Sequence, residues 1–186
     1  LVQRNVYDRF MELLEPAVAG VVVGDPASRD TEMGPLVSRP HWEKVASYVP
    51  DDAPVAFRGQ APTGPGYWFP PTVLTPGRTD RSVTEEIFGP VVTVLAFDDE
   101  ADAVALANDT VYGLSGSIWT DDLSRALRVS RAVEAGNLSV NSHSSVRFTT
   151  PFGGFKQSGL GRELGADAPL AFTDTKNVFI AVKEML

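Results

Sequence analysis

The stretch that sets the fold class is residues 91–140, which read VVTVLAFDDEADAVALANDTVYGLSGSIWTDDLSRALRVSRAVEAGNLSV. It begins with a continuous apolar run, which is typical of a strand buried on both faces. Amphipathic and apolar segments then alternate, and Asp121 or Asp122 is expected to cap the second helix, which ends at Ala135-Gly136. The predicted strands and helices are, in chain order, 91–97, 99–108, 114–119, the capped helix and 137–140. This alternation predicts an α/β fold, a three-layer arrangement of a parallel sheet with helices on both faces.

Two helices are predicted before this stretch. Apolar residues fall at helical spacing over residues 5–15 and again over residues 39–49. Pro16 is expected to end or kink the first helix, because proline lacks a backbone donor. Ser38 is a suitable N-cap for the second helix, whose apolar face would include Trp42.

The remaining segments give weaker signals. Residues 67–74 are apolar but contain Pro70-Pro71, so they are expected to form an edge strand at best. One or two helical turns are predicted over residues 166–173, and a terminal strand over residues 177–182.

Composition narrows the class of protein. The chain has 186 residues, of which 43% are hydrophobic and 22% charged, so it can form a domain with its own core. Its net charge of −8 disfavours nucleic acid and anionic membranes as partners, and it also favours solubility. No apolar run approaches the roughly 20 residues of a membrane helix. No signal peptide is recognisable, so the cytoplasm is the expected location. Leu1 and the apolar pattern after it indicate that the chain begins partway through a longer polypeptide.

The first chemically informative loop is Glu85-Glu86-Ile87-Phe88-Gly89-Pro90, directly before the predicted strand at 91–97. Adjacent carboxylates are most often solvated. At the mouth of a sheet, however, a carboxylate can accept both hydroxyls of a ribose, and a neighbouring aromatic ring can pack on a flat ring such as nicotinamide. Both interpretations remain open from the residues alone.

The second loop is Pro151-Phe152-Gly153-Gly154-Phe155-Lys156-Gln157-Ser158-Gly159, which continues through Gly161-Arg162-Glu163-Leu164-Gly165. Five glycines within residues 151–165 indicate unusual backbone conformations or a close approach to another group. For Lys156 and Arg162 a scaffold role is favoured over chemistry.

The two loops together resemble signatures of the NAD(P)-dependent aldehyde dehydrogenases, and the resemblance extends along nearly the whole chain. It includes Gly24-Asp25-Pro26, Phe69-Pro70-Pro71-Thr72-Val73, Gly136-Asn137-Leu138 and Thr175-Lys176-Asn177-Val178. The resemblance implies a partial catalytic domain over residues 1–174. It also implies an oligomerisation strand and tail over residues 175–186, which family members use to pair across subunits.

The resemblance also assigns roles in binding. NAD or NADP is the implied cofactor, with Glu86 holding the nicotinamide ribose and Phe88 flanking the nicotinamide. Phe152 is the implied contact for a small-molecule aldehyde, and Ser144 and Val146 lie in the loop that varies with substrate in the family. Arg147 in that loop could pair with an acidic substrate group or be solvated.

The family's catalytic residues are not found in this sequence. The family uses a cysteine thiolate as nucleophile and a glutamate as general base, and the chain has no cysteine. By this register the cysteine lies just before Leu1, and the main N-terminal cofactor domain lies earlier still. The chain alone is therefore expected to be inactive. A non-catalytic binding or assembly module that kept the fold, or an acylating relative that uses coenzyme A, remains an alternative.

Two histidines complete the set of candidate residues. His41 falls in the first turn of a predicted helix and is expected on the surface, whereas His143 lies near the substrate loop. Neither has a nucleophile beside it, and no HExxH pattern occurs, so the sequence predicts neither a catalytic triad nor a metal site.

Overall fold

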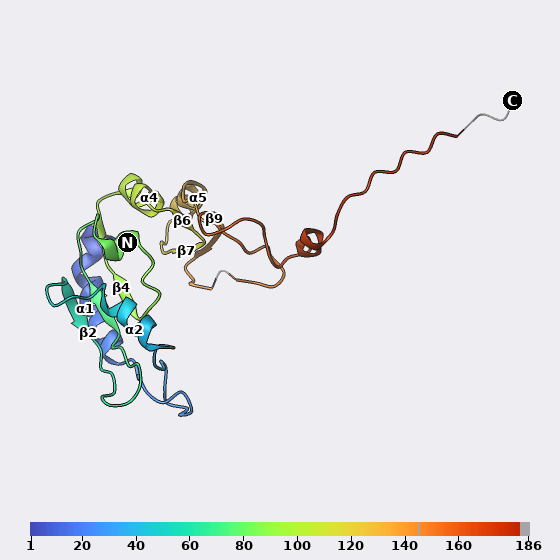
Figure 1. Ribbon diagram of the computed structural model, residues 1–186. Helices are drawn as coiled ribbons and strands as arrows, with labels where there is room; N and C mark the ends of the chain where they lie inside the picture. The colour runs from blue at the N-terminus through green and yellow to red at the C-terminus, as the bar shows by residue number, and fades with distance from the viewer. Residues whose placement is uncertain (145, 183–186) are drawn as a thin grey trace. The chain divides into compact units, whose positions relative to one another are not determined.

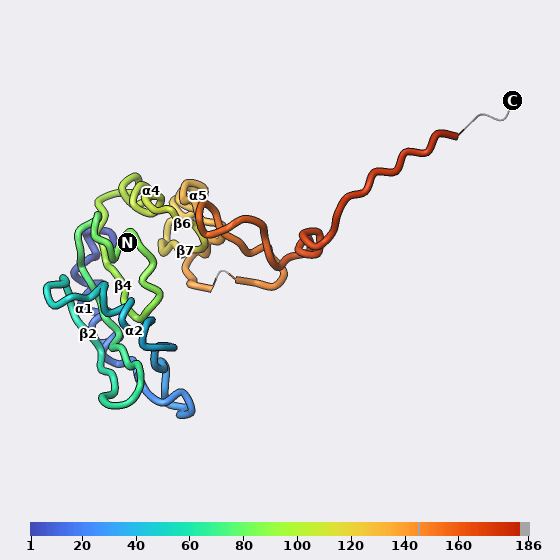
Figure 2. The backbone as a smooth tube through the Cα atoms, in the orientation of Figure 1, coloured from blue at the N-terminus to red at the C-terminus, as the bar shows by residue number. Residues whose placement is uncertain are grey.

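The computed structural model describes residues 1–144 and 146–182, and its backbone divides into two compact units (Figures 1 and 2). The first unit is Leu1–Ala103, and the second begins at Val104. Each unit is described by itself below. The predicted division into a domain over residues 1–174 and a tail over residues 175–186 stays a prediction.

The first unit contains short strands and three helices, and a fourth helix crosses its boundary. In chain order these elements are β1 (Val2–Gln3), α1 (Arg4–Ala19), α2 (Arg39–Ala46), β2 (Val55–Arg58), β3 (Thr72–Leu74), α3 (Arg81–Thr84), β4 (Val91–Thr93), β5 (Ala96–Phe97) and α4 (Glu100–Asn108). The second unit continues with β6 (Tyr112–Gly113), β7 (Ser115–Ile118), α5 (Leu123–Ala132), β8 (Asn137–Val140), β9 (Phe155–Lys156) and the 3₁₀ helix η1 (Ala168–Phe172).

The main sheet of the first unit has the order β2-β3-β4, with β3 antiparallel to β2 and parallel to β4. All three residues of β3 are buried. The prediction of an edge strand at best was therefore wrong for this segment. Pro70 and Pro71 precede the strand, and the first donor of the ladder is the Thr72 N–H, which bonds the Pro90 carbonyl at 2.9 Å. The prolines consequently remove no hydrogen bond from the centre of the sheet.

The predicted strand over residues 91–97 is divided between two sheets. Its first part, β4, pairs with β3, whereas β5 pairs in parallel with β1. Between them Val94 donates its N–H to Leu74, and the Leu95 carbonyl accepts from Val2. The prediction of one continuous strand buried on both faces was thus wrong, because consecutive residues bond to different neighbours and Val92 is 50% exposed.

The second unit contains a parallel β7–α5–β8 segment, in which β7 and β8 pair over four residues. Asp122 caps α5 by accepting the Arg125 N–H at 3.0 Å, which confirms one of the two predicted caps. Within the described residues, β7 and β8 pair only with each other. The three-layer arrangement expected from the sequence stays a prediction. The elements alternate as an α/β protein requires, but the strands lie in separate small sheets.

Helix α1 continues past Pro16 to Ala19. Of the two predicted effects of Pro16, an end of the helix was therefore wrong, and a kink stays a prediction. Proline removes one N–H from the ladder, but the Pro16 carbonyl still accepts the Gly20 N–H at 3.0 Å. Only one bond near the end of a 16-residue helix is lost.

The core cluster of the first unit lies between α2, β3 and the loop before β4. It consists of the buried side chains of Val45, Tyr48, Phe69 and Ile87. The N-cap of α2 is Ser38, as predicted, whose hydroxyl accepts the His41 N–H at 3.3 Å. This cluster ties the loop over residues 85–90 to α2.

The described C-terminal residues 173–182 belong to no helix or strand, although η1 confirms the helical turn predicted just before them. The strand predicted over residues 177–182 therefore has no pairing in the described part of the chain. A strand needs a neighbour to satisfy its backbone groups, and Phe179 is 87% exposed. Residues 183–186 of the predicted tail lie outside the described residues.

Candidate functional site

The loop Glu85–Pro90 is held at alternate residues. The Glu85 carboxylate accepts the Tyr48 hydroxyl at 2.8 Å and the Arg81 Nε–H at 3.0 Å. These two hydrogen bonds, the one from Tyr48 first, lower the pKa of Glu85 from its ordinary value. Burial, together with the bond to Glu85, raises the pKa of Tyr48. The Arg81 guanidinium also lies over the Tyr48 ring, 4.1 Å from its centroid.

Two further residues of the loop are fixed by packing. Ile87 is buried in the core cluster beside Val45. Gly89 lies so close to Val45 that a Cβ at position 89 would stand 2.5 Å from the Val45 Cγ2 atom. Val45 is fully buried, so it has little freedom to move away. Position 89 therefore requires glycine because of close approach.

The residues between these anchors carry the predicted cofactor contacts. Glu86 is exposed, and the described residues make no recorded hydrogen bond or ion pair with its side chain. Phe88 is 72% exposed and has a positive φ of 57°, a conformation that is unfavourable for a bulky L-residue. Thus Glu85, Ile87 and Gly89 anchor the loop, whereas Glu86 and Phe88 remain available for a ligand.

His41 is a contact of this loop that sequence analysis did not predict. Its Nε2 atom lies 2.7 Å from the Phe88 carbonyl oxygen, and the two rings are 6.3 Å apart between centroids. His41 is half-buried and its Nδ1 atom is buried, so the residue lies only partly at the surface. The two residues are 47 positions apart, and no local pattern connects them.

The free side chains of this loop, a hydrogen-bond acceptor and an aromatic ring, fit a nicotinamide nucleotide. A carboxylate without a protein partner can accept two hydroxyl donors of a ribose. An exposed aromatic ring on a fixed backbone can pack against a flat heterocycle. Glu86 and Phe88 supply these two groups two residues apart.

The second loop is also fixed by its backbone. Phe152 and Glu163 exchange two N–H···O bonds, each 2.7 Å long. Asn137 donates its side-chain amide to the Gly153 carbonyl at 2.9 Å, and Gly136 packs against the same carbonyl with no room for a Cβ. Phe152, the predicted substrate contact, is half-buried in this paired segment.

The neighbouring loop, which is the predicted substrate loop, is more open. Ser144 and Val146 are both exposed, and Arg147 ties them together by donating to the Ser144 hydroxyl at 2.8 Å and to the Val146 carbonyl at 3.1 Å. Ser145, which belongs to the same predicted loop, lies outside the described residues. Arg147 thus contacts its own loop.

Contacts of Lys156 and Arg162 support the scaffold role favoured for them. The Lys156 ammonium bonds the carbonyls of Asn108 and Thr110 at 2.8 and 3.1 Å and pairs with Glu134 at 2.7 Å. Arg162 donates to backbone carbonyls of the glycine-rich loop and lies over the Phe155 ring. Both cations are used inside the second unit.

The predicted site residues thus fall into two groups. Glu86 and Phe88 share one loop of the first unit, whereas Ser144, Val146 and Phe152 belong to the second unit. Among the described residues, no three His, Asp or Glu side chains gather closely enough to hold a metal ion. No helix in the described part of the chain is long and apolar enough to cross a membrane.

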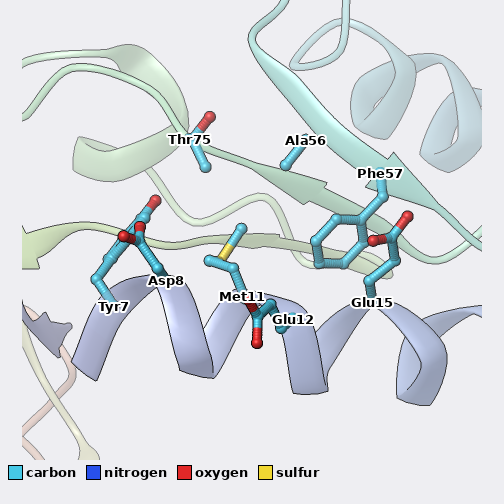
Figure 3. A pocket seen from close by; sticks show the side chains of 8 residues that line it. All are labelled: Tyr7, Asp8, Met11, Glu12, Glu15, Ala56, Phe57 and Thr75. Atoms are coloured by element: carbon cyan, nitrogen blue, oxygen red, sulfur yellow. The ribbon is translucent and has the colours of Figure 1, made fainter.

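An open groove lies elsewhere in the first unit. It has a volume of about 470 Å³ and lies between α1 and β2, and Figure 3 shows Met11 and Phe57 on its opposite walls. The lining residues are Tyr7, Asp8, Met11, Glu12, Glu15, Ala56, Phe57 and Thr75. None of them is a predicted cofactor or substrate contact.

Comparison with known proteins gives matches that include both loops. The sequence model described as "Aldehyde dehydrogenase family" matches residues 1–178. An aldehyde dehydrogenase of Aspergillus niger is 41% identical over the whole chain, and a betaine aldehyde dehydrogenase of Mesorhizobium japonicum is 40% identical over 96% of it. A crystal structure of betaine aldehyde dehydrogenase from Staphylococcus aureus in complex with NAD⁺ superposes on 92% of the chain, with a TM-score of 0.86 and 38% identity.

These relatives are longer than the chain. It spans 38% of the length of the Aspergillus protein, 39% of the Mesorhizobium protein and 36% of the Staphylococcus structure.

Proposed function

The chain belongs to the aldehyde dehydrogenase family, and from this premise we propose that it supplies one wall of an active site that oxidises an aldehyde to a carboxylic acid. The observation that carries the proposal is the loop Glu85–Pro90. Its alternate residues are anchored, and it leaves a carboxylate and an aromatic ring free for a ligand.

Two residues of this loop would hold NAD or NADP, the cofactors of the family. When bound, the nicotinamide accepts a hydride from the substrate. The Glu86 carboxylate would accept the hydroxyls of the nicotinamide ribose, and the exposed Phe88 ring would flank the nicotinamide. Because Glu85 and Gly89 fix the backbone on both sides, the two side chains need little reorganisation to bind.

Substrate contacts are proposed for the second unit. Phe152 would contribute an apolar wall for the aldehyde, with Ser144 and Val146 from the preceding loop selecting its shape. Fixation of Phe152 by the paired backbone at Glu163 supports this assignment, because a substrate wall has to keep its place.

The nucleophile and the general base are proposed to lie outside this chain. The 186 residues include no cysteine, and the chain spans 38% of its Aspergillus relative. In the parent enzyme a cysteine thiolate would attack the aldehyde carbonyl to give a hemithioacetal, and loss of hydride from it to the nicotinamide would give a thioester. Water activated by a glutamate would then hydrolyse the thioester. The chain alone is therefore proposed to be inactive.

Assembly is also proposed from the family. The finer architecture would be a three-layer catalytic domain completed by the N-terminal cofactor domain of the parent enzyme. Residues 177–182 would become a paired strand against a second copy, which the exposure of Phe179 and Ile180 supports. The cytoplasmic location stays a prediction.

The decisive experiment compares Glu86→Gln with Glu43→Gln in the parent protein. Glu86→Gln replaces a charged acceptor with a neutral amide, and the loss of charge-assisted hydrogen bonds should raise the KM for NAD by about 10- to 100-fold. Glu43 is an exposed carboxylate on α2, and its substitution should leave KM unchanged. Steady-state rates of NADH formation give the KM for NAD of each variant. An unchanged KM in Glu86→Gln would remove Glu86 from the cofactor site.

A second candidate function is a non-catalytic assembly module, and the absence of cysteine favours it. The intact mass of the natural protein separates the two. A mass of 20.0 kDa, with no NADH formed from any aldehyde, would support the module. A larger protein with a Gly-Gln-x-Cys-like element before Leu1 would support the enzyme. Dependence of the rate on coenzyme A, with an acyl thioester as product, would identify the acylating relative.

A further inference from the structure

We infer that His41 is a positioning residue, which holds the cofactor-facing Phe88 in place through the Phe88 backbone carbonyl. The inference rests on the proposed function for the role of Phe88, and on geometry for the contact itself. His41 lies on α2, 47 positions before Phe88 in the sequence.

The contact defines the state of the imidazole. A carbonyl oxygen can only accept a hydrogen bond, so the Nε2 atom of His41 carries a hydrogen and is the donor. The distance between Nε2 and the Phe88 carbonyl oxygen is 2.7 Å. The Nδ1 atom is buried and has no hydrogen-bond partner among the described residues. All of the hydrogen bonding of this ring that the structure records is thus directed at one atom, the Phe88 carbonyl oxygen.

The loop needs such a contact at Phe88. A φ of 57° is unfavourable for a phenylalanine, and the backbone keeps it only where the surroundings impose it. The ring of Phe88 is 72% exposed, so packing of its own side chain gives little restraint. The hydrogen bond from His41 is the recorded polar contact that restrains this residue directly.

One side of α2 contacts the loop at successive positions. His41 and Val45 are four residues apart, so they lie on the same helical face. His41 bonds Phe88, and Val45 packs against Gly89. Just beyond the helix, Tyr48 bonds Glu85. α2 and the residue just beyond it therefore hold the loop in place, and His41 contacts Phe88, whose φ is unfavourable.

The experiment uses the parent protein with the variants His41→Leu, His41→Gln and Glu43→Leu. Leucine removes the donor and leaves the Phe88 carbonyl unpaired, whereas glutamine keeps a donor of similar reach. Glu43→Leu controls for an apolar residue on the exposed surface of the same helix. Three quantities are measured: hydrogen exchange of the peptide spanning residues 85–93, the Kd for NADH by fluorescence titration, and the KM values for NAD and aldehyde.

We expect His41→Leu to accelerate exchange in this peptide and to raise the Kd for NADH and the KM for NAD by about tenfold, the effect of one lost hydrogen bond. The KM for aldehyde and the melting temperature should change little. His41→Gln should restore both constants to within about threefold, and Glu43→Leu should match the wild type. A purely structural role would lower the melting temperature without separating the two KM values.

Unchanged exchange and unchanged NADH affinity in His41→Leu would overturn the inference. If His41→Leu does not fold, His41→Asn, whose amide is too short to reach the carbonyl, is judged by the same measurements. If the wild type does not bind NADH, the proposed function fails, and hydrogen exchange alone still decides whether His41 restrains Phe88.

Discussion

At the scale of single residues, alternate positions of the candidate cofactor loop differ: some hold its backbone in place, and the others leave their side chains exposed to a ligand. Glu85 and Ile87 have their side chains engaged by the protein, and Gly89 has no side chain because none would fit. Glu86 and Phe88 lie between them with their side chains exposed. A short loop can in this way keep a fixed backbone and still offer two groups to a ligand, which lowers the entropy that binding would otherwise cost.

Gly89 provides a stability test of this arrangement. We expect Gly89→Ala to destabilise the protein by about 1–3 kcal/mol, because the new Cβ would overlap the buried Val45 side chain. The matched control is Gly77→Ala, since Gly77 has open space around its Cβ position. Urea midpoints of the two variants, measured side by side, check the prediction. Equal midpoints would show that Val45 can move aside at no cost.

At the scale of elements, α2 organises the site although it carries no predicted contact to cofactor or substrate. Its N-terminus is fixed by the Ser38 cap, and its inner face meets the loop at His41 and Val45. The short helix α3 adds Arg81, which bonds Glu85 and lies over the Tyr48 ring. Two helices thus hold the loop that precedes β4 in the main sheet of the first unit.

Tyr48→Phe tests this arrangement through its pH dependence. The pKa of Glu85 is below its ordinary value of 4.5 in the folded state, so the ionised carboxylate stabilises the fold above that pH. This contribution is lost as the pH falls below 4.5 and through the lower folded pKa. We expect Tyr48→Phe to lower the urea midpoint near neutral pH, because the hydrogen bond that contributes most to the shift is gone.

The difference between Tyr48→Phe and wild type should shrink in that acidic window, where the Glu85 carboxylate becomes protonated in both proteins. Tyr67→Phe is the control, since Tyr67 contacts Arg39 through its ring and not through a recorded hydroxyl bond in the described residues. A difference that stays constant from neutral to acidic pH would mean that Tyr48 acts by packing alone.

At the scale of the whole molecule, the chain has more apolar surface than its core can cover. Nine hydrophobic side chains are buried in the described residues, and many large ones are exposed, including Phe10 and Leu13 on α1 and Phe179 near the C-terminus. Such surface is typical of a chain that packs against further protein. It agrees with the coverage of 38% of a longer relative.

Phe179→Asp tests the assembly role proposed for residues 177–182. A charge in the middle of an apolar strand should prevent its burial between subunits, so the parent enzyme should shift to a smaller assembly. Val37→Asp is the control, because Val37 is equally exposed but lies far from this segment in sequence. Light scattering after size-exclusion chromatography measures the mass of both. An unchanged mass for Phe179→Asp would contradict the predicted strand.

The sequence by itself determined the features that depend on residues close to one another in the chain. The Ser38 and Asp122 caps, the helical turn before the C-terminal segment and the strands of the β7–α5–β8 segment depend on residues a few positions apart, and the structure has them where the pattern predicted. The matching family was likewise recognisable from two short loops.

Only the tertiary structure decided which strands pair and which loop side chains are free. β3 became the centre of a sheet because its prolines precede the ladder, and residues 91–97 were divided because Val2 and Leu74 bond to different parts of them. The bond from His41 to Phe88 spans 47 positions in the sequence. Pairing and burial depend on residues that are distant in the chain, and local patterns carry no information about such partners.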